Sequence, residues 1–102
     1  MILSADAFKT KKVLSSDGRE VGQVTGVQFD VQTWKVAWID VKVPRDTLPD
    51  LGMKKPLMGT YSIKVSPDRI SNVTDTVMLS PTIAELGAFA NSDTEADGVA
   101  KL

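Results

Sequence analysis

The sequence predicts an all-β fold, a small barrel built from one strongly coiled sheet, and three observations lead to this prediction. First, residues 18–43 contain two runs rich in Val, Ile, Phe and Trp on either side of a polar turn at 30–33, which is typical of a β-hairpin. Second, the apolar side chains change faces within both runs. Third, the other segments are short, so the hairpin is expected to form the sheet on which they pack.

The change of face predicts where the hairpin bends. Val24 and Val27 are both apolar positions of the first run, although strict alternation would place them on opposite faces. Thr25–Gly26 is the expected site of a bulge, because glycine tolerates the bulge conformation. The second run changes faces between Trp38 and Ile39. Two neighbouring strands that bend at similar points predict a coiled sheet, whereas strands buried on both faces would suit a larger chain.

Shorter elements are expected around the hairpin. Ser4 is suited to cap a helical turn at 5–9. Apolar or alternating segments predict further strands at 13–14, 60–65 and 76–79.

The C-terminal part is expected to contain one short helix and a tail. Ser80 and Pro81 stand in the preferred order to begin a helix, and Gly87 would end it. Residues 1–87 are therefore expected to form one domain. Residues 88–102 are small, polar and mildly acidic, which predicts a disordered C-terminal tail.

Composition argues against catalysis. The chain of 102 residues has no cysteine and no histidine, so disulfides, thiolate chemistry and the usual proton shuttle are absent. Neither a glycine-rich phosphate loop nor an EF-hand spacing occurs, and the aspartates stand mostly at turns, where they bond local backbone. We therefore expect no enzyme, no cofactor and no metal; a ligand carrier that uses carboxylates in the barrel mouth is the weaker alternative.

Charge and hydropathy bear on partners and location. Twelve basic and thirteen acidic residues give a net charge of −1, which argues against nucleic-acid binding because such binding requires a basic excess. No apolar run approaches the ~20 residues of a membrane span, and residues 1–12 lack the pattern of a signal peptide. A cytoplasmic protein is expected.

Trp34 closes the hairpin turn and is the first candidate for partner binding. A hairpin loop of this length commonly ends with a left-handed residue, most often glycine, and a tryptophan there costs on the order of 1 kcal/mol. Trp34 either caps the end of the barrel or forms a binding hot spot, since tryptophan is enriched at the centres of interfaces. The sequence leaves both interpretations open.

The irregular segment 44–59 supplies the other candidates. Its prolines and glycines exclude a long helix or a central strand, yet it is rich in large apolar side chains. It either covers the core, which is the favoured interpretation, or forms an adaptable partner surface. The candidate residues are Leu48, Leu51, Met53, Leu57 and Met58.

The order of short motifs resembles the PRC-barrel domain, a family named for the cytoplasmic domain of the photosynthetic reaction-centre H subunit. The matching segments are Asp17-Gly18, Gly22-Gln23-Val24, Phe29-Asp30, Lys35–Val43, a shortened Pro67–Ile70 and Val73–Leu79. Two positions depart from the family pattern: Gly26 stands where an acidic residue is common, and Trp34 where glycine is usual. The resemblance extends from Leu3 to Ser80, and residues 51–57 look most like stand-alone archaeal members.

This resemblance implies a small six-stranded antiparallel PRC-type β-barrel with short terminal helical turns. It also implies a protein–protein interaction or assembly module, as part of the archaeal FtsZ-based cell-division machinery reached through the adaptor SepF. Another PRC-barrel protein is a further candidate partner, and a homo-oligomer, a dimer, is expected because small barrels with exposed edges readily pair. The alternative is an RNA- or ribosome-associated module similar to the ribosome maturation factor of this family.

Overall fold

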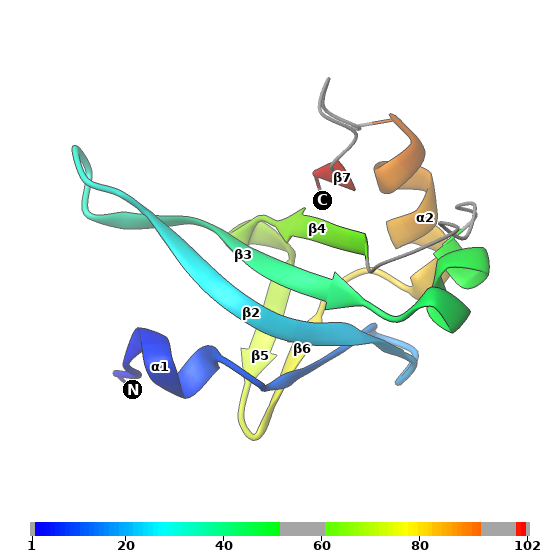
Figure 1. The fold of residues 1–102 in the computed structure, drawn as a ribbon, viewed down its shortest axis with the longest axis horizontal. Helices are drawn as coiled ribbons and strands as arrows, with labels where there is room; N and C mark the ends of the chain where they lie inside the picture. The colour runs from blue at the N-terminus through cyan, green and yellow to red at the C-terminus, as the bar shows by residue number, and fades with distance from the viewer. Residues whose placement is uncertain (1, 52–60, 93–99, 102) are drawn as a thin grey trace.

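The structure is a computed structural model that describes residues 2–51, 61–92 and 100–101. Strands dominate these residues (Figure 1). They are β1 (Lys12–Leu14), β2 (Glu20–Asp30), β3 (Lys35–Val43), β4 (Tyr61–Val65), β5 (Ile70–Val73), β6 (Thr76–Leu79) and β7 (Ala100–Lys101). The helices are α1 (Ala5–Phe8) and α2 (Ile83–Ser92), with 3₁₀ turns η1 (Arg45–Leu51) and η2 (Pro67–Arg69).

One sheet contains all of these strands, in the order β5-β6-β1-β2-β3-β4-β7. The all-β prediction is confirmed, and β1–β6 supply the six expected strands, to which β7 adds a short seventh. The expectation of a closed, wholly antiparallel barrel is wrong. β1 pairs with β6 in parallel and β4 pairs with β7 in parallel. β5 and β6 form an antiparallel hairpin, and its second strand, β6, lies beside β1 and runs in the same direction. Among the described residues β5 and β7 form separate edges, so the sheet curls without closing.

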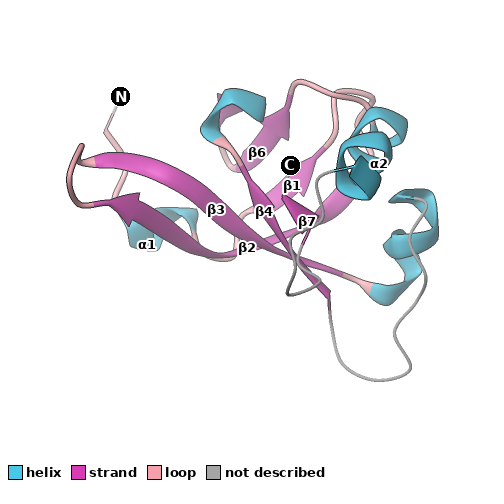
Figure 2. Cartoon of the chain, turned by 90° about the horizontal axis from the view of Figure 1, so that it is seen from above, coloured by secondary structure: helices cyan, strands magenta, loops and turns pink. Residues whose placement is uncertain are grey.

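Two bulges bend the central hairpin, as its changing apolar face predicted. The pairing of β2 with β3 passes from Val24 to Gly26 and leaves Thr25 as an extra residue, at the predicted place. Further out, the pairing skips Ala37 of β3, which is slightly nearer the turn than the predicted change at Trp38–Ile39. Each extra residue shifts the alternation of its strand by one position. The two long strands consequently coil across the molecule (Figure 2).

The core lies under the inner half of this hairpin and is almost wholly aliphatic. Fully or nearly fully buried side chains come from every long element of residues 1–87 that the structure describes. They are Val13, Val21, Val24, Ile39, Val41, Val43, Leu48, Leu51, Ile63, Val65, Val77, Leu79, Ile83 and Leu86. Such a core gives the sheet a rigid base from which the outer half of the hairpin extends.

The helix α2 differs from its prediction at both ends. Thr82, not Ser80, is the cap: its Oγ1 accepts a hydrogen bond from the Glu85 amide, and the Glu85 carboxylate accepts one from the Thr82 amide. Gly87 does not end the helix, which continues to Ser92; instead it lies against η1. A Cβ at Gly87 would lie 2.7 Å from the Leu51 carbonyl oxygen.

Part of the segment for which a disordered tail was predicted has regular structure. The helix α2 continues to Ser92, and β7 adds to the edge of β4. Residues 93–99 and 102, to which the prediction also applied, lie outside the described residues. Helices long and apolar enough to cross a bilayer are absent from the part of the chain that the structure describes.

Candidate interaction surface

The outer half of the β2–β3 hairpin projects beyond the core and carries a continuous apolar face. In Figures 1 and 2 the two strands extend well past β4, β5 and β6 and end in a free turn. Val27 pairs with Ile39, and Phe29 pairs with Val36, one step nearer the tip. The extra residue Ala37 places Val36 on the same face as Ile39, which alternation alone would not do.

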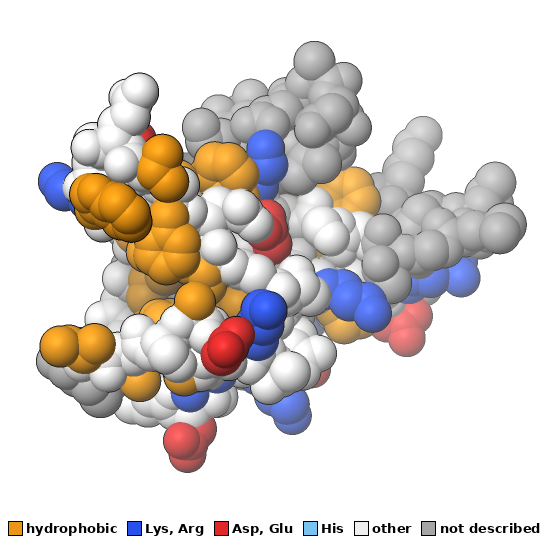
Figure 3. Space-filling model, turned by 60° about the vertical axis from the view of Figure 1, so that its left-hand side comes forward, with side chains coloured by type: hydrophobic (Ala, Val, Ile, Leu, Met, Phe, Trp, Pro, Cys, Tyr) orange, Lys and Arg blue, Asp and Glu red, His pale blue; other side chains and the backbone are white. Residues whose placement is uncertain are grey.

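A hollow of about 250 Å³ lies where this face meets the rest of the domain. Its walls come from α1, both hairpin strands, η2 and β5, and all the residues that line it are apolar. The lining residues are Phe8, Val27, Val36, Ile39, Pro67, Ile70 and Val73. Seen from the hairpin end, hydrophobic side chains gather along the hairpin and around this hollow (Figure 3).

Trp34 stands at the tip of the same hairpin and is 80% exposed. Its φ of 59° is left-handed, as its place at the end of the turn predicted. The Trp34 amide donates to the Asp30 carbonyl at 2.7 Å, and the Asp30 carboxylate accepts from the Gln32 amide at 2.9 Å. These bonds fix the turn in the conformation that strains Trp34. The exposure of Trp34 rules out the interpretation that it caps the barrel end.

Other large apolar side chains near the tip are also exposed. Val31 is 70% and Phe29 51% exposed. We call this surface the hairpin face. It consists of the hollow together with Phe29, Val31 and Trp34. Large contiguous apolar patches on soluble proteins often mark interaction sites.

Where the structure describes segment 44–59, it covers the core, which is the interpretation that the sequence favoured. Leu48 and Leu51 of η1 are completely buried in the core, so their interpretation as partner contacts is wrong and the alternative, cover for the core, is right for both. Arg19 helps to hold η1 in place through a 2.6 Å ion pair with Asp50. The remaining candidates Met53, Leu57 and Met58 lie outside the described residues.

The opposite face of the hairpin is polar and satisfied. Asp40 accepts hydrogen bonds from Gln28 Nε2 at 2.7 Å and from Trp38 Nε1 at 3.0 Å. The Lys64 ammonium lies 4.8 Å from the centre of the Trp38 ring, a cation–π contact. The two tryptophans of the hairpin therefore differ: Trp38 is part of an internal network, whereas Trp34 projects into solvent.

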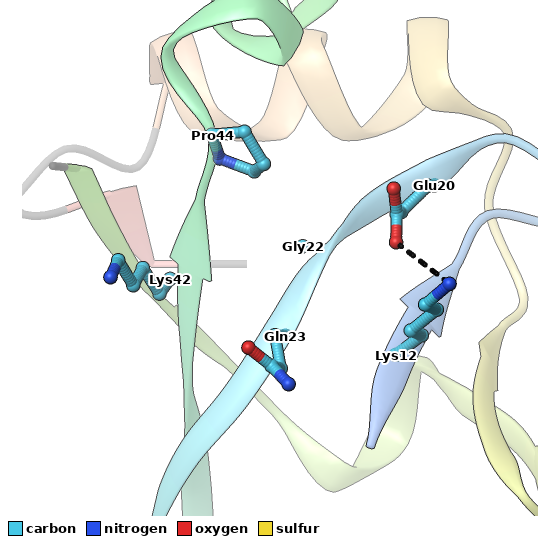
Figure 4. A pocket seen from close by; sticks show the side chains of 6 residues that line it. All are labelled: Lys12, Glu20, Gly22, Gln23, Lys42 and Pro44. Carbon is cyan, nitrogen blue, oxygen red and sulfur yellow. Dashed lines mark ion pairs between the residues drawn. The ribbon is translucent and has the colours of Figure 1, made fainter. Parts of the chain in front are cut away.

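A second depression, on the strands nearer the core, has a mixed lining (Figure 4). Lys12 and Glu20 form an ion pair of 3.9 Å on one side of it, and the Lys42 side chain points away from that pair. Gly22 also lines it, and a Cβ at this position would clash with the Lys42 carbonyl oxygen. Groups of three or more acidic side chains arranged to hold a metal ion are not found within residues 2–51 and 61–92.

Sequence reasoning found Trp34 but missed the hollow. Three regions of the sequence line it, at residue 8, residues 27–39 and residues 67–73, and each contributes apolar residues that are typical of an ordinary core. The one available signal was the second change of face in the hairpin, which brings Val36 to the same side as Ile39.

The family comparison agrees with this architecture. The family model of the PRC-barrel domain matches residues 2–82, which is most of the chain and includes the whole hairpin. No curated protein matches the sequence. A PRC-barrel domain suggests a small interaction or assembly module, and function on such a fold depends on its surface. The match over residues 2–82 establishes that this chain belongs to the PRC-barrel domain family.

Proposed function

We propose that this chain is a non-catalytic protein-interaction module whose contact surface is the hairpin face. The observation that carries the proposal is Trp34. Its left-handed backbone costs about 1 kcal/mol, and its indole is left 80% in water. A residue that lowers stability at its own position contributes little to folding, so its contribution lies in what it contacts outside the chain.

The chemistry of the hairpin face suits a protein partner. Tryptophan and other aromatic side chains carry a large share of interface binding energy, because they bury much area at a small cost in conformational entropy. Trp34 and Phe29 offer two such side chains on one rigid hairpin, beside an apolar hollow. The net charge of −1 also favours a protein over a nucleic acid as the partner.

The finer proposal concerns the partner. The likeness of residues 51–57 to stand-alone archaeal members makes the FtsZ-based division machinery the process to test, and SepF the first partner to test. In this scheme the protein acts as an adaptor in the cytoplasm and carries out no reaction.

A binding measurement with matched variants tests both proposals. The full chain is immobilised as wild type, as Trp34→Ser, and as Gln32→Ser, which alters an exposed polar residue of the same turn. Purified SepF is passed over each, and an unrelated small β-barrel serves as the blank. If Trp34 is a hot spot, Trp34→Ser weakens binding about thirtyfold or more and Gln32→Ser leaves it unchanged.

The outcomes separate the coarse proposal from the fine one. Absence of SepF binding above the blank overturns SepF as the partner. Capture from lysate of the native host, compared between wild type and Trp34→Ser, then addresses the hairpin face itself. If both variants retain the same set of proteins, the hairpin face is not the contact surface.

A further inference from the structure

The hairpin face carries both a projecting side chain and an apolar hollow, and the two are complementary. We infer that the hollow receives Trp34 of a second copy of this chain, and that two chains pair about a two-fold axis with each Trp34 in the hollow of the other. This inference rests on the proposed function and names a partner for the same surface.

Size and polarity both fit an indole. An apolar cavity of about 150 Å³ is large enough to bind benzene, and the hollow measures about 250 Å³. Its seven lining residues are all apolar, so an entering side chain strands no charge and breaks no ion pair. Several of them, including Phe8, Ile70 and Val73, are only half-buried, so they would gain burial from an occupant.

Trp34 does not occupy the hollow of its own chain. The two lie on the same hairpin, and Val36, two residues from Trp34, is the lining residue nearest the tip. The Trp34 side chain is nevertheless 80% exposed, so it projects into solvent. We therefore assign the hollow to Trp34 of another molecule.

A two-fold axis satisfies both sites at once. In an isologous contact both chains use the same patch. Trp34 of each chain can therefore enter the hollow of the other. The axis then passes near the Phe29–Val36 pair, which lies between the turn and the deeper lining residues Val27 and Ile39. These two exposed side chains would then meet their own symmetry mates. One contact thus buries the exposed apolar residues on this side of the hairpin.

Sedimentation and fluorescence of the full chain test the inference. We expect wild type to reach twice the 11.0 kDa of one chain at micromolar to sub-millimolar concentrations. Trp34→Ser weakens dimerisation about thirtyfold or more, as expected for a hot spot, while Gln32→Ser does not. The emission of wild type shifts to the blue as concentration rises, because Trp34 leaves water. Trp34→Ser, whose remaining tryptophan is Trp38, shows no such shift.

Mixing variants provides the sharper test of two-fold pairing. Ile70→Asp places a charge in the hollow but keeps the Trp34 projection; its circular dichroism is checked first, and Val73→Asp replaces it if it does not fold. Each variant alone is expected to be mainly monomeric. Trp34→Ser lacks the projecting side chain, and the hollow variant lacks the site that receives it. An equimolar mixture of Trp34→Ser with the hollow variant restores one complete contact and forms a weak heterodimer. A mixture that stays monomeric contradicts the pairing of Trp34 with the hollow.

Two further results would overturn the inference. One is wild type that remains at 11.0 kDa at every concentration; if Trp34→Ser nevertheless abolishes binding of another protein, the proposed function stands and only the second copy is excluded. The other is a dimer unaffected by Trp34→Ser, which would place the contact on a different surface.

Discussion

At the scale of single residues, Trp34 stands where the backbone prefers glycine. Its φ of 59° brings Cβ close to the following carbonyl oxygen, which costs about 1–2 kcal/mol for a residue with a side chain. Trp34→Gly should therefore raise the free energy of unfolding by up to about 1 kcal/mol after the greater flexibility of the unfolded glycine chain is subtracted. Denaturant unfolding in dilute solution measures this change.

The matched control for that prediction is Trp34→Ala. Alanine removes the indole but keeps Cβ and its strain, so it should leave stability close to that of wild type. A marked loss of stability in both variants would mean that the indole supports the fold, and would remove the argument that it serves a partner.

Asp17 lies in the turn between β1 and β2, and its carboxylate links that turn to the start of α2 by accepting a hydrogen bond from the Ile83 amide. The Ser15 hydroxyl donates to its carboxylate and is the main reason why its pKa lies below the ordinary 3.8. Burial opposes this effect, and the Asp17 and Ile83 amides and Arg19 add to it; the Ile83 amide lies 3.3 Å from the carboxylate. Because the folded state favours the charged form, the stabilisation is complete above pH 3.8 and is lost as pH falls through the folded-state pKa.

The expected consequence is a flatter acid limb for Asp17→Asn. Wild type should lose stability below pH 3.8 more steeply than the variant, since asparagine takes up no proton there. Unfolding followed by circular dichroism between neutral and acidic pH gives both curves. NMR titration of the Asp17 carboxyl checks the cause, because Ser15→Ala should raise its pKa. Parallel acid limbs would contradict the linkage.

At the scale of elements, Gly87 shows how a glycine within a helix can be required by packing. An alanine at an ordinary helix position is worth about 1 kcal/mol relative to glycine. Here its Cβ would lie 2.7 Å from the Leu51 carbonyl oxygen, and backbone cannot easily move. Gly87→Ala should therefore destabilise the protein by about 1–3 kcal/mol, the usual cost of overpacking.

The sign of the change decides this prediction. Propensity alone predicts that Gly87→Ala stabilises, whereas contact between α2 and η1 predicts that it destabilises. Chemical denaturation of the two proteins is sufficient. A stabilised variant would mean that α2 does not pack on η1 as the structure places it.

The elements also show what local sequence could predict. The bulge at Thr25 follows from alternation within one strand, so the residues on either side reveal it. Gly87 was misjudged because a glycine near a helix end usually caps it, and only the position of Leu51 explains its role. The parallel pairing of β1 with β6 joins segments that are distant in the chain, and no local pattern encodes it. For the same reason Trp34 was predictable as a candidate and the hollow was not.

At the scale of the whole molecule, the apolar face of β3 passes without a break from core to surface. Ile39 is 2% exposed and packs within the core, whereas Val36 on the same face is 37% exposed. The bulge at Ala37 connects the two. Folding and binding therefore use one continuous surface, of which the inner part holds the domain together and the outer part is available to a partner.

This division predicts opposite outcomes for the same substitution at two neighbouring sites. Ile39→Asp buries a charge with no partner, which costs several kcal/mol out of a total stability of about 5–15 kcal/mol for a domain, and should unfold most or all of the protein. Val36→Asp can hydrate its carboxylate and should cost about 1 kcal/mol, since position 36 is 37% exposed and reaches water. Circular dichroism and thermal unfolding compare the two. The Val36→Asp protein should remain folded but sediment as a monomer, because its charge lies at the proposed two-fold axis. Equal loss of structure in both variants would mean that the outer hairpin belongs to the core, and that the hairpin face is not free to bind.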